Sequence, residues 1–433
     1  MRKYIIEDTR LLSPFNERAR DLRVLNQPLW LAQRDALAPY TREERVIPSL
    51  DQAPADRVET IAHRDNLFFD RPFIDEFIAR ARQERKACRV AFALDDKAIT
   101  THALNLQSGI RREGNVYVAD LWYFPYGRDT TIRPLVIDTQ AREIGYYNVP
   151  KYMAPNQGDL VFQVPQRAFL SIEHWVHVFI ANSPFGVFAE GARAEKRIEQ
   201  LGFKLRVLWR ALVERRQVLT SSALVKKGRN VHIDPSAVIL GPVTVGNNVV
   251  IGPGVVIDNC HIGNNVSISH GCVLTLSVVS DGCFLPFRAS LFMTTLMENS
   301  MVAQNTCLQM CVIGRDTFIG AGNTFTDFNM ISKPIRVMHG DRLAEVGVPV
   351  IGGCVGHNCR IGSGFVIFPG RTIESDVLLA AHRGQRVLTQ NVTYEDSDHH
   401  AIPGAARLFP AQYRPALPEP IGFPARQREG VAD

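Results

Sequence analysis

The sequence contains no long hydrophobic run and no strong excess of either charge. No window approaches the roughly 18 uncharged apolar residues that a membrane-spanning helix needs, so we expect no membrane span. The first residues, MRKYIIEDTR, place acids where a signal peptide has its apolar stretch, which predicts a cytoplasmic protein. A net charge of +5 over 433 residues argues against a nucleic-acid partner, and 45% hydrophobic content excludes a wholly disordered chain.

Charge is scarce, and cysteine is concentrated, in one part of the chain. Between 231 and 380 only 17 of 150 residues are charged, against 21% of the whole sequence, while 18 of the 31 glycines fall there. This change of composition indicates a separate domain. The same stretch holds seven of the eight cysteines, which without an export signal we expect to be reduced: Cys260, Cys272, Cys283, Cys307, Cys311, Cys354 and Cys359.

Aliphatic residues in this domain recur every six positions. One run includes Ile239, Val245, Ile251 and Ile257, and another follows near the end of the domain. A helix would need spacings of three and four, and it would be weakened by the glycines. A six-residue period instead predicts a left-handed parallel β-helix over 231–383, with about eight coils of roughly 18 residues and with Gly or Asn at the corners.

Two further features of the repeat domain can be interpreted from their spacing. The cysteine pairs 307/311 and 354/359 lack the spacing usual for zinc, so we interpret the thiols as small core residues. The segment 332–350 interrupts the hexads and carries charge. It predicts an arm that leaves the solenoid on its binding face, or alternatively a neutral surface loop.

The first half, 1–190, mixes strand and helix patterns and is predicted to be an α/β or α+β domain. Strands are expected where short apolar runs occur, and helices are expected at Pro72–Gln83 and Leu29–Ala38. The expected strands are Tyr4–Ile6, Cys88–Leu94, Val116–Phe124, Ile132–Ile137 and Leu160–Val164.

Residues 191–230 are predicted to be a linker that contains an amphipathic helix. Between 193 and 217, eight basic and three acidic residues give a net charge of +5. An apolar stripe runs along the helix and consists of Ile198, Leu201, Leu205, Leu208 and Leu212. We expect this stripe to lie against the first coil, although a basic amphipathic helix can also bind a membrane or an acidic polymer. The Pro-rich tail, 384–433, is predicted to be disordered or bound to the surface.

Three segments together resemble one family. They are YIIEDTRLLSPFNERARDLRV (Tyr4–Val24), HVFIANSPFGVFAEGARAEKRI (His177–Ile198), and CVIGRDTFIGAGNTFTDFN (Cys311–Asn329) with its continuation Val350–Ile373. They are similar to sugar-1-phosphate nucleotidylyltransferases joined to a left-handed β-helix acyltransferase domain, such as the bifunctional N-acetylglucosamine-1-phosphate uridylyltransferases.

The resemblance implies a homotrimer that acts on a sugar phosphate or a nucleotide sugar. It also implies a degenerate nucleotidyltransferase-like N-terminal domain, with Asp21, Arg23 and Asp65 as substrate-binding residues and with Mg²⁺ if that site is active. In the solenoid, it implies that acyl-CoA meets the turn formed by Gly320, Ala321 and Gly322.

The sequence departs from this family at both reaction centres. No glycine-rich phosphate loop follows Ile6, and Gln304 occupies the position of the acyltransferase histidine. His270 and His339 are the remaining candidates for a general base. We therefore weigh a transferase against a catalytically inactive trimeric scaffold or nucleotide-sugar-binding protein. A third hypothesis is a metal-dependent lyase like the β-helix carbonic anhydrases, which requires three histidines near one interface, although we predict no metal site.

Overall fold

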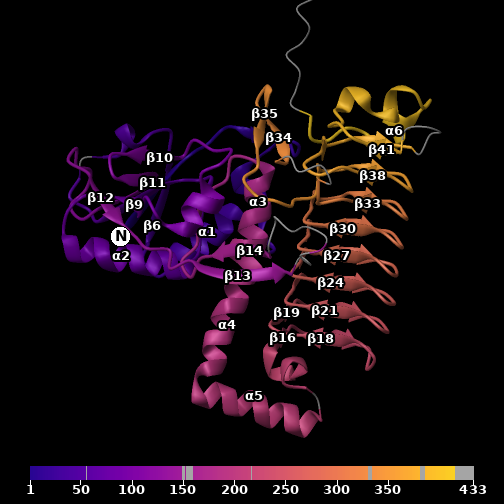
Figure 1. Cartoon of the computed structure of the whole chain (residues 1–433). Helices are drawn as coiled ribbons and strands as arrows, with labels where there is room; N and C mark the ends of the chain where they lie inside the picture. Colours follow the sequence, from indigo (N-terminus) through magenta and orange to yellow (C-terminus); the bar gives the residue numbers. More distant parts are fainter. Residues whose placement is uncertain are drawn as a thin grey trace, which may run out of the picture.

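The structure is a computed structural model that describes residues 1–54, 56–148, 152, 159–215, 217–329, 334–380 and 386–414. An N-terminal α/β domain lies beside a long solenoid, and the helices α4 (Ala189–Glu199) and α5 (Leu201–Glu214) connect the two (Figure 1). Among the described helices, none is long and apolar enough to cross a membrane.

The N-terminal domain is built on a mixed seven-stranded sheet. Its strand order is β12-β9-β11-β7-β1-β6, with β10 paired to β11. Strand β1 is parallel to both β6 and β7, whereas β11 runs antiparallel to β7 and β9. The strands are β1 (Arg2–Ile6), β6 (Glu43–Ile47), β7 (Thr60–Arg64), β9 (Cys88–Ala93), β10 (Ile110–Glu113), β11 (Val116–Phe124) and β12 (Arg133–Val136).

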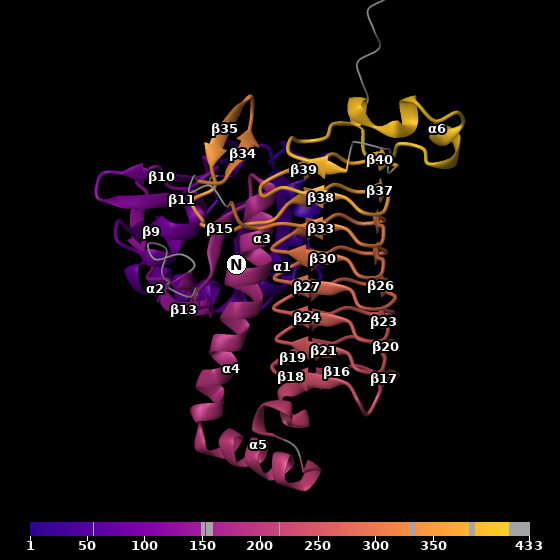
Figure 2. The same ribbon diagram turned by 45° about the vertical axis from the view of Figure 1, so that its right-hand side comes forward.

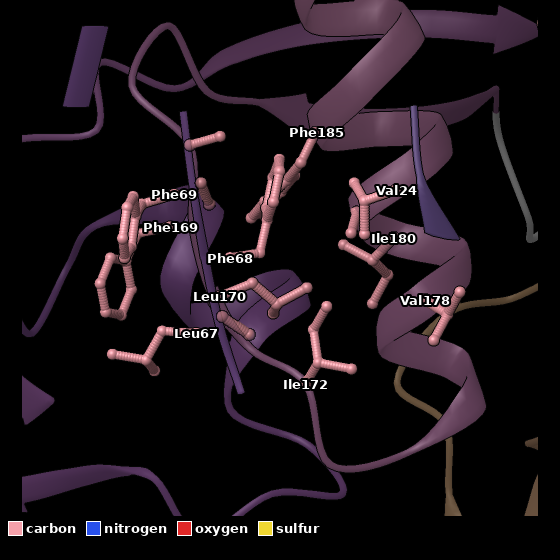
Figure 3. Close-up of a cluster of buried hydrophobic side chains, with 14 of the residues drawn as sticks. Val24, Leu67, Phe68, Phe69, Phe169, Leu170, Ile172, Val178, Ile180 and Phe185 are labelled. Atoms are coloured by element: carbon pink, nitrogen blue, oxygen red, sulfur yellow. The ribbon is translucent and has the colours of Figure 1, made fainter. Parts of the chain in front are cut away.

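Helices and short strand pairs complete this domain. The α2 helix (Arg71–Glu84) begins after Asp70, whose carboxylate accepts the main-chain N–H of Phe73, so its start is capped as Asp followed by Pro predicts. Figure 3 shows β8 and β15 facing α3 through a cluster of buried aliphatic and aromatic side chains. The remaining elements are α1 (Leu29–Leu37), α3 (Trp175–Asn182), β2 (Leu11–Leu12), β3 (Glu17–Arg18), β4 (Arg23–Val24), β5 (Gln27–Pro28), β8 (Leu67–Phe69), β13 (Arg142–Tyr147), β14 (Leu160–Val164) and β15 (Phe169–Ser171).

The C-terminal domain is a left-handed β-helix of three parallel eight-stranded sheets, as the hexads predicted (Figure 2). The first solenoid sheet contains β16 (Val225–Lys227), β19 (Val243–Val245), β22 (His261–Ile262), β25 (Val278–Val279), β28 (Thr295–Leu296), β31 (Val312–Ile313), β36 (Cys354–Val355) and β39 (Thr372–Ile373). The second contains β17 (Val231–Ile233), β20 (Val249–Ile251), β23 (Ser267–Ile268), β26 (Phe284–Leu285), β29 (Met301–Val302), β32 (Phe318–Ile319), β37 (Arg360–Ile361) and β40 (Leu378–Leu379). The third contains β18 (Val238–Leu240), β21 (Val256–Asp258), β24 (Val273–Thr275), β27 (Ser290–Phe292), β30 (Cys307–Gln309), β33 (Thr324–Phe325), β38 (Val366–Ile367) and β41 (Val387–Leu388).

The solenoid core confirms the interpretation of the cysteines. Inward-facing aliphatic side chains such as Ile251 and Ile268 are fully buried, and so are six of the seven cysteines; Cys307 is half-buried. Burial raises the pKa of the Cys260 thiol to about 12, so this group packs as a small hydrophobe. At the predicted corners, Asn248 adopts a φ of 56° and Asn265 a φ of 55°.

The solenoid extends beyond the predicted range at both ends. Its first strand begins at Val225, and β41 lies within the segment predicted to be a tail. Residues 386–414 then cover the last coil and include the short helix α6 (Ala405–Leu408). Asp376 accepts the main-chain N–H groups of Gln412 and Tyr413 at 2.8 and 2.7 Å. Residues 386–414 of the predicted tail are therefore packed on the surface rather than disordered, and 381–385 and 415–433 lie outside the described residues.

The predicted linker helix is two helices, and its apolar stripe faces away from the solenoid. The helix breaks at Gln200, where ψ is 123°. After the break, α5 buries Val207 and Ala211, while the predicted stripe residues Leu205 and Leu212 are 57% and 76% exposed. The prediction that this stripe covers the first coil was wrong, and the side chain of Ile198 lies outside the described residues.

Strand β24 offers a test of the inward and outward alternation. Leu274 is fully buried and its neighbour Val273 is 41% exposed. We expect Leu274→Ala to lower the free energy of unfolding by about 2–5 kcal/mol, because it leaves a cavity in the core. The matched Val273→Ala should cost less than about 1 kcal/mol. Urea unfolding followed by circular dichroism measures both, and equal losses would contradict this register.

Candidate functional site

An ion-pair cluster fixes the N-terminal domain on the upper coils of the solenoid. Nη1 of Arg315 lies 2.5 Å from Oε1 of Glu17, and Nη2 donates to the main-chain oxygen of Asp21 at 3.1 Å. The fully buried His357 places Nε2 3.2 Å from Oε2 of Glu17 and accepts the Arg315 N–H through Nδ1. Burial would raise the pKa of Glu17, but His357 and Arg315 beside it lower that pKa below its usual value. The cluster thus holds an ionised carboxylate between the domains.

The predicted substrate residues Asp21 and Arg23 lie at this interface. The Arg23 guanidinium forms an ion pair with Glu298 of the solenoid, and Asp21 contributes its main-chain oxygen to Arg315. A role for these two residues in substrate binding stays a prediction. The side chain of Asp21 is exposed enough to meet a ligand, whereas the guanidinium of Arg23 already has a partner.

Asp65 lies where β1 and β7 end, at the edge where parallel sheets commonly bind ligands. Its Oδ1 accepts the Asp8 N–H at 2.7 Å, and its Oδ2 lies 3.2 Å from Nη1 of Arg20. The carboxylate of Asp8 is in turn held by Arg10. Within the described part of the chain, no three His, Cys, Asp or Glu residues are grouped as metal ligands. Because arginines and a main-chain N–H already occupy these carboxylates, the donor set does not fit the expected Mg²⁺.

The turn predicted to meet acyl-CoA uses its main-chain N–H groups inside the solenoid. Gly320 donates to the oxygen of Ile361, Gly322 donates to that of Gln304, and Ala321 donates to Oγ of Ser363. All three amides are therefore already bonded to neighbouring coils. Contact with acyl-CoA stays a prediction, and it would have to use other groups of this corner.

The structure separates the two predicted catalytic histidines. His270 is exposed at a solenoid corner. Hydrogen bonds from Ser236 lower the pKa of Asp234, and the nearby His270 adds a smaller contribution. His339 ends β34 (Arg336–His339), which forms a hairpin with β35 (Arg342–Glu345). This hairpin is the predicted arm, and it packs on the N-terminal domain of the same chain, where Val337 and Val346 are buried. Residues 330–333, where the arm leaves the solenoid, lie outside the described residues.

Three histidines do approach one another at the arm, as the lyase hypothesis requires. The ring of His174 lies 6.0 Å from that of His339 and 6.3 Å from that of His177. In both His174 and His177, Nδ1 accepts a main-chain N–H and Nε2 bonds a main-chain oxygen. Burial lowers the pKa of His174 to about 3 and that of His177 to about 4. This arrangement suits neutral structural histidines, and their nitrogens are not free to bind a metal.

The buried His177 predicts a loss of stability in acid. Its folded pKa of about 4 lies below the ordinary value of 6.5, so the unfolded chain binds more protons between these pH values. The stabilisation is complete above pH 6.5 and declines as the pH falls, by about 1.4 kcal/mol per pH unit. In His177→Gln we expect the slope of unfolding free energy against pH near pH 5 to fall by about this amount. The exposed His400→Gln is the control, and an unchanged slope in the first variant would refute the assignment.

A cationic cleft lies lower down, where α4, the start of α2 and the first coils meet. We call it the junction cleft. It comprises two adjoining cavities of about 450 and 420 Å³, whose shared lining is Arg71, Pro72, Glu190, Arg193 and His261. Arg197 and Lys226 also line the larger cavity. Apart from His261, the wall of the larger cavity holds the cations Arg71, Arg193, Arg197 and Lys226 against the carboxylate of Glu190, and the smaller cavity adds the carboxylates of Asp35 and Asp70.

A histidine–carboxylate pair lies inside the junction cleft. His261 projects from β22, and its Nε2 is 2.6 Å from Oε2 of Glu190 on α4. Burial would raise the pKa of Glu190, but the bond to His261 and nearby cations lower it below its usual value. Such a pair fixes the orientation of the ring, as a general base requires.

Two cations of the cleft remain available to a ligand. Arg193 is paired with Asp70 at 2.8 Å, and Arg71 with Asp75 at 2.5 Å. Among the described residues, no ion pair engages the side chains of Arg197 or Lys226. Next to the base, the cleft therefore offers Arg197 and Lys226, which have no ion-pair partner among the described residues and suit an anionic ligand.

Sequence reasoning overlooked this cleft. It did not name His261 as a candidate and did not consider Glu190, 71 residues away along the chain. A weak signal was present, because the strongly basic segment predicted at 193–217 contributes both Arg193 and Arg197.

Comparison with known proteins agrees with the solenoid. Residues 228–259 match the family described as bacterial transferase hexapeptide (six repeats). A comparison with curated proteins finds no match. Among solved structures, the chain is similar to UDP-N-acetylglucosamine acyltransferase from Campylobacter jejuni, with 16% identity and a TM-score of 0.28. That match covers 37% of this chain and 62% of the other, so it spans less than two thirds of that protein.

Proposed function

We propose that this protein is a hexapeptide-repeat transferase that binds a phosphorylated ligand, a sugar phosphate or a nucleotide sugar, in the junction cleft. The observation that carries the proposal is the pair of His261 and Glu190, 2.6 Å apart, beside the uncompensated cations Arg197 and Lys226. The hexapeptide match supports the transferase class. The cations would hold the phosphate, while the histidine would act on the acceptor group.

In this proposal His261 is a general base. Glu190 occupies Nε2, and no described residue bonds Nδ1, so Nδ1 is the nitrogen that would accept a proton. His261 would take the proton from a hydroxyl or amine of the acceptor while Glu190 stabilises the imidazolium. Acyl-CoA, as the proposed donor, supplies an acyl thioester. The acceptor oxygen or nitrogen bonds to the carbonyl carbon, the C–S bond breaks, and His261 returns the proton to the departing thiolate.

A second candidate is a binding protein or scaffold without catalysis. The amides of Gly320, Ala321 and Gly322 are already bonded within the solenoid, and Asp8 and Asp65 do not fit Mg²⁺. These features favour a protein whose two inherited reaction centres have lost their chemistry. It would still bind a nucleotide sugar through the cations of the cleft.

For either candidate we propose a cytoplasmic homotrimer. On the second solenoid sheet, the outward-facing side chains at paired positions stack from coil to coil. We call this row the outward ladder; it includes Val250, Ser267, Phe284, Met301 and Phe318. Val250 and Phe284 in this ladder are 48% and 40% exposed. Met301 and Phe318 are half-buried. The ladder is polar at His232, Ser267 and Arg360, and its apolar members support packing against the solenoids of other copies.

The catalytic proposal is tested by separating binding from turnover. Thiol release from acetyl-CoA would be measured with a panel of sugar phosphates and nucleotide sugars, and affinity by calorimetry. We expect His261→Gln to lower kcat about a hundredfold or more with nearly unchanged affinity. Lys226→Gln should weaken binding about tenfold by removing a charge-assisted bond. The matched control is His400→Gln, at an exposed histidine outside both the cleft and the outward ladder.

The outcomes distinguish the two candidates. Binding that depends on Lys226 without any thiol release would support the binding protein over the enzyme. An active His261→Gln variant would contradict the role of His261. The absence of both binding and turnover across the panel would contradict the junction cleft as the ligand site.

The assembly is tested at the outward ladder. We expect light scattering to give three times the chain mass of 48.4 kDa. Phe284→Asp should shift the mass toward the monomer, because it introduces charge into the apolar ladder. The exposed Phe409→Asp, at the end of α6, is the control and should leave the mass unchanged. A monomeric parent chain would contradict the proposal.

A further inference from the structure

Helix α5 leaves a continuous apolar surface uncovered. We call this surface the outer face of α5; it consists of Leu201, Leu205, Leu208, Trp209, Leu212 and Val213. Trp209 is 63% exposed and Leu201 is 72% exposed. At 100° per residue these positions fall within one arc of the helix, opposite the buried Val207 and Ala211. The exposed Val218 and Leu219 follow directly after the helix. A single chain rarely leaves so many large apolar side chains together in water without a partner.

Basic residues border the outer face on both sides. On the same helical projection, Lys204 lies at one edge and Arg206 and Arg210 lie at the other. All three are exposed. The single acid of α5, Glu214, projects on the side away from the outer face, and its Oε1 lies 3.8 Å from Nη1 of Arg210. Lys204 and Arg206 have no ion-pair partner among the described residues. The surface therefore combines an apolar centre with positive margins, from which long side chains reach outward.

The helix lies at a free end of the molecule. Figures 1 and 2 both show α5 running across the end of the solenoid, beyond the first coil and away from the upper coils. The inner side of α5 is held by packing of Val207 and Ala211, and Phe203 reaches the junction cleft. The outer face is thus presented by a helix that is already folded and anchored.

We propose that α5 is a membrane-surface helix that binds anionic lipid bilayers. The charge pattern carries this choice: apolar side chains would enter the boundary between headgroups and acyl chains, and Lys204, Arg206 and Arg210 would meet lipid phosphates on both sides. The protein adsorbs to the surface through this helix and does not span the bilayer. The inference is independent of the proposed transferase activity, because no residue of the outer face lines the junction cleft.

The test uses the full chain and vesicles of phosphatidylcholine, either alone or with an equal part of phosphatidylglycerol. We expect flotation only with the anionic vesicles and weaker binding at high salt. Leu205→Ser with Leu212→Ser, and separately Lys204→Gln with Arg210→Gln, should each weaken binding at least tenfold. The controls are Leu408→Ser, at another exposed leucine, and Lys86→Gln with Arg112→Gln, at exposed basic residues elsewhere. All replaced side chains are exposed, so the fold should be retained.

Trp209 supplies an independent signal from the helix itself. Two of the other three tryptophans, Trp122 and Trp175, are buried. Binding should therefore shift tryptophan emission to the blue, and Trp209→Phe should abolish this shift while the protein still floats. Equal binding to both vesicle types would overturn the proposal. Vesicle binding that the α5 variants leave intact would also overturn it. So would a parent chain that does not bind vesicles but has a lower mass in Leu205→Ser with Leu212→Ser, because the outer face would then mediate self-association.

Discussion

The pair between Glu17 and Arg315 decides where the N-terminal domain sits on the solenoid. Both groups are largely removed from water, and removing one partner from a buried pair typically costs about 3–5 kcal/mol. Its geometry depends on the short hairpin of β2 and β3, which begins at Leu11 after strand β1 ends at Ile6. The strand that organises the first domain thereby also fixes its orientation toward the second, and the junction cleft exists only in that orientation.

A second set of contacts completes the cleft from below. The N-cap of α2, Asp70, binds Arg193 of α4, so the same carboxylate starts one helix and positions another. Placed in this way, α4 brings Glu190 to His261 on the first solenoid sheet. The proposed base and its partner therefore come from different domains. Their distance depends on the interface between the domains more than on either fold alone.

The sequence predicted what depends on short-range periodicity and missed what depends on contacts between distant residues. The hexads predicted eight coils because each aliphatic position has the same local surroundings, and β11 and β14 match their predicted ranges. The pairing of His261 with Glu190 has no local pattern. The stripe on α5 was recognised, but periodicity shows that a helix has an apolar face without showing what covers it. The buried residues of α5, Val207 and Ala211, lie on its opposite side, and the helix contacts the turns Val218–Thr220 and Ser222–Leu224 that precede the solenoid.

The arm has a mechanical consequence for the molecule. It leaves the solenoid between β33 and β36 and returns to the N-terminal domain, where the oxygen of Met338 meets His174. Near the last coil, Ser375 also donates to the oxygen of Pro14. The first domain is thus attached through the linker below and, above, through these two contacts together with the pairs of Glu17 with Arg315 and of Arg23 with Glu298. Ligands would reach the junction cleft past exposed side chains such as Arg197.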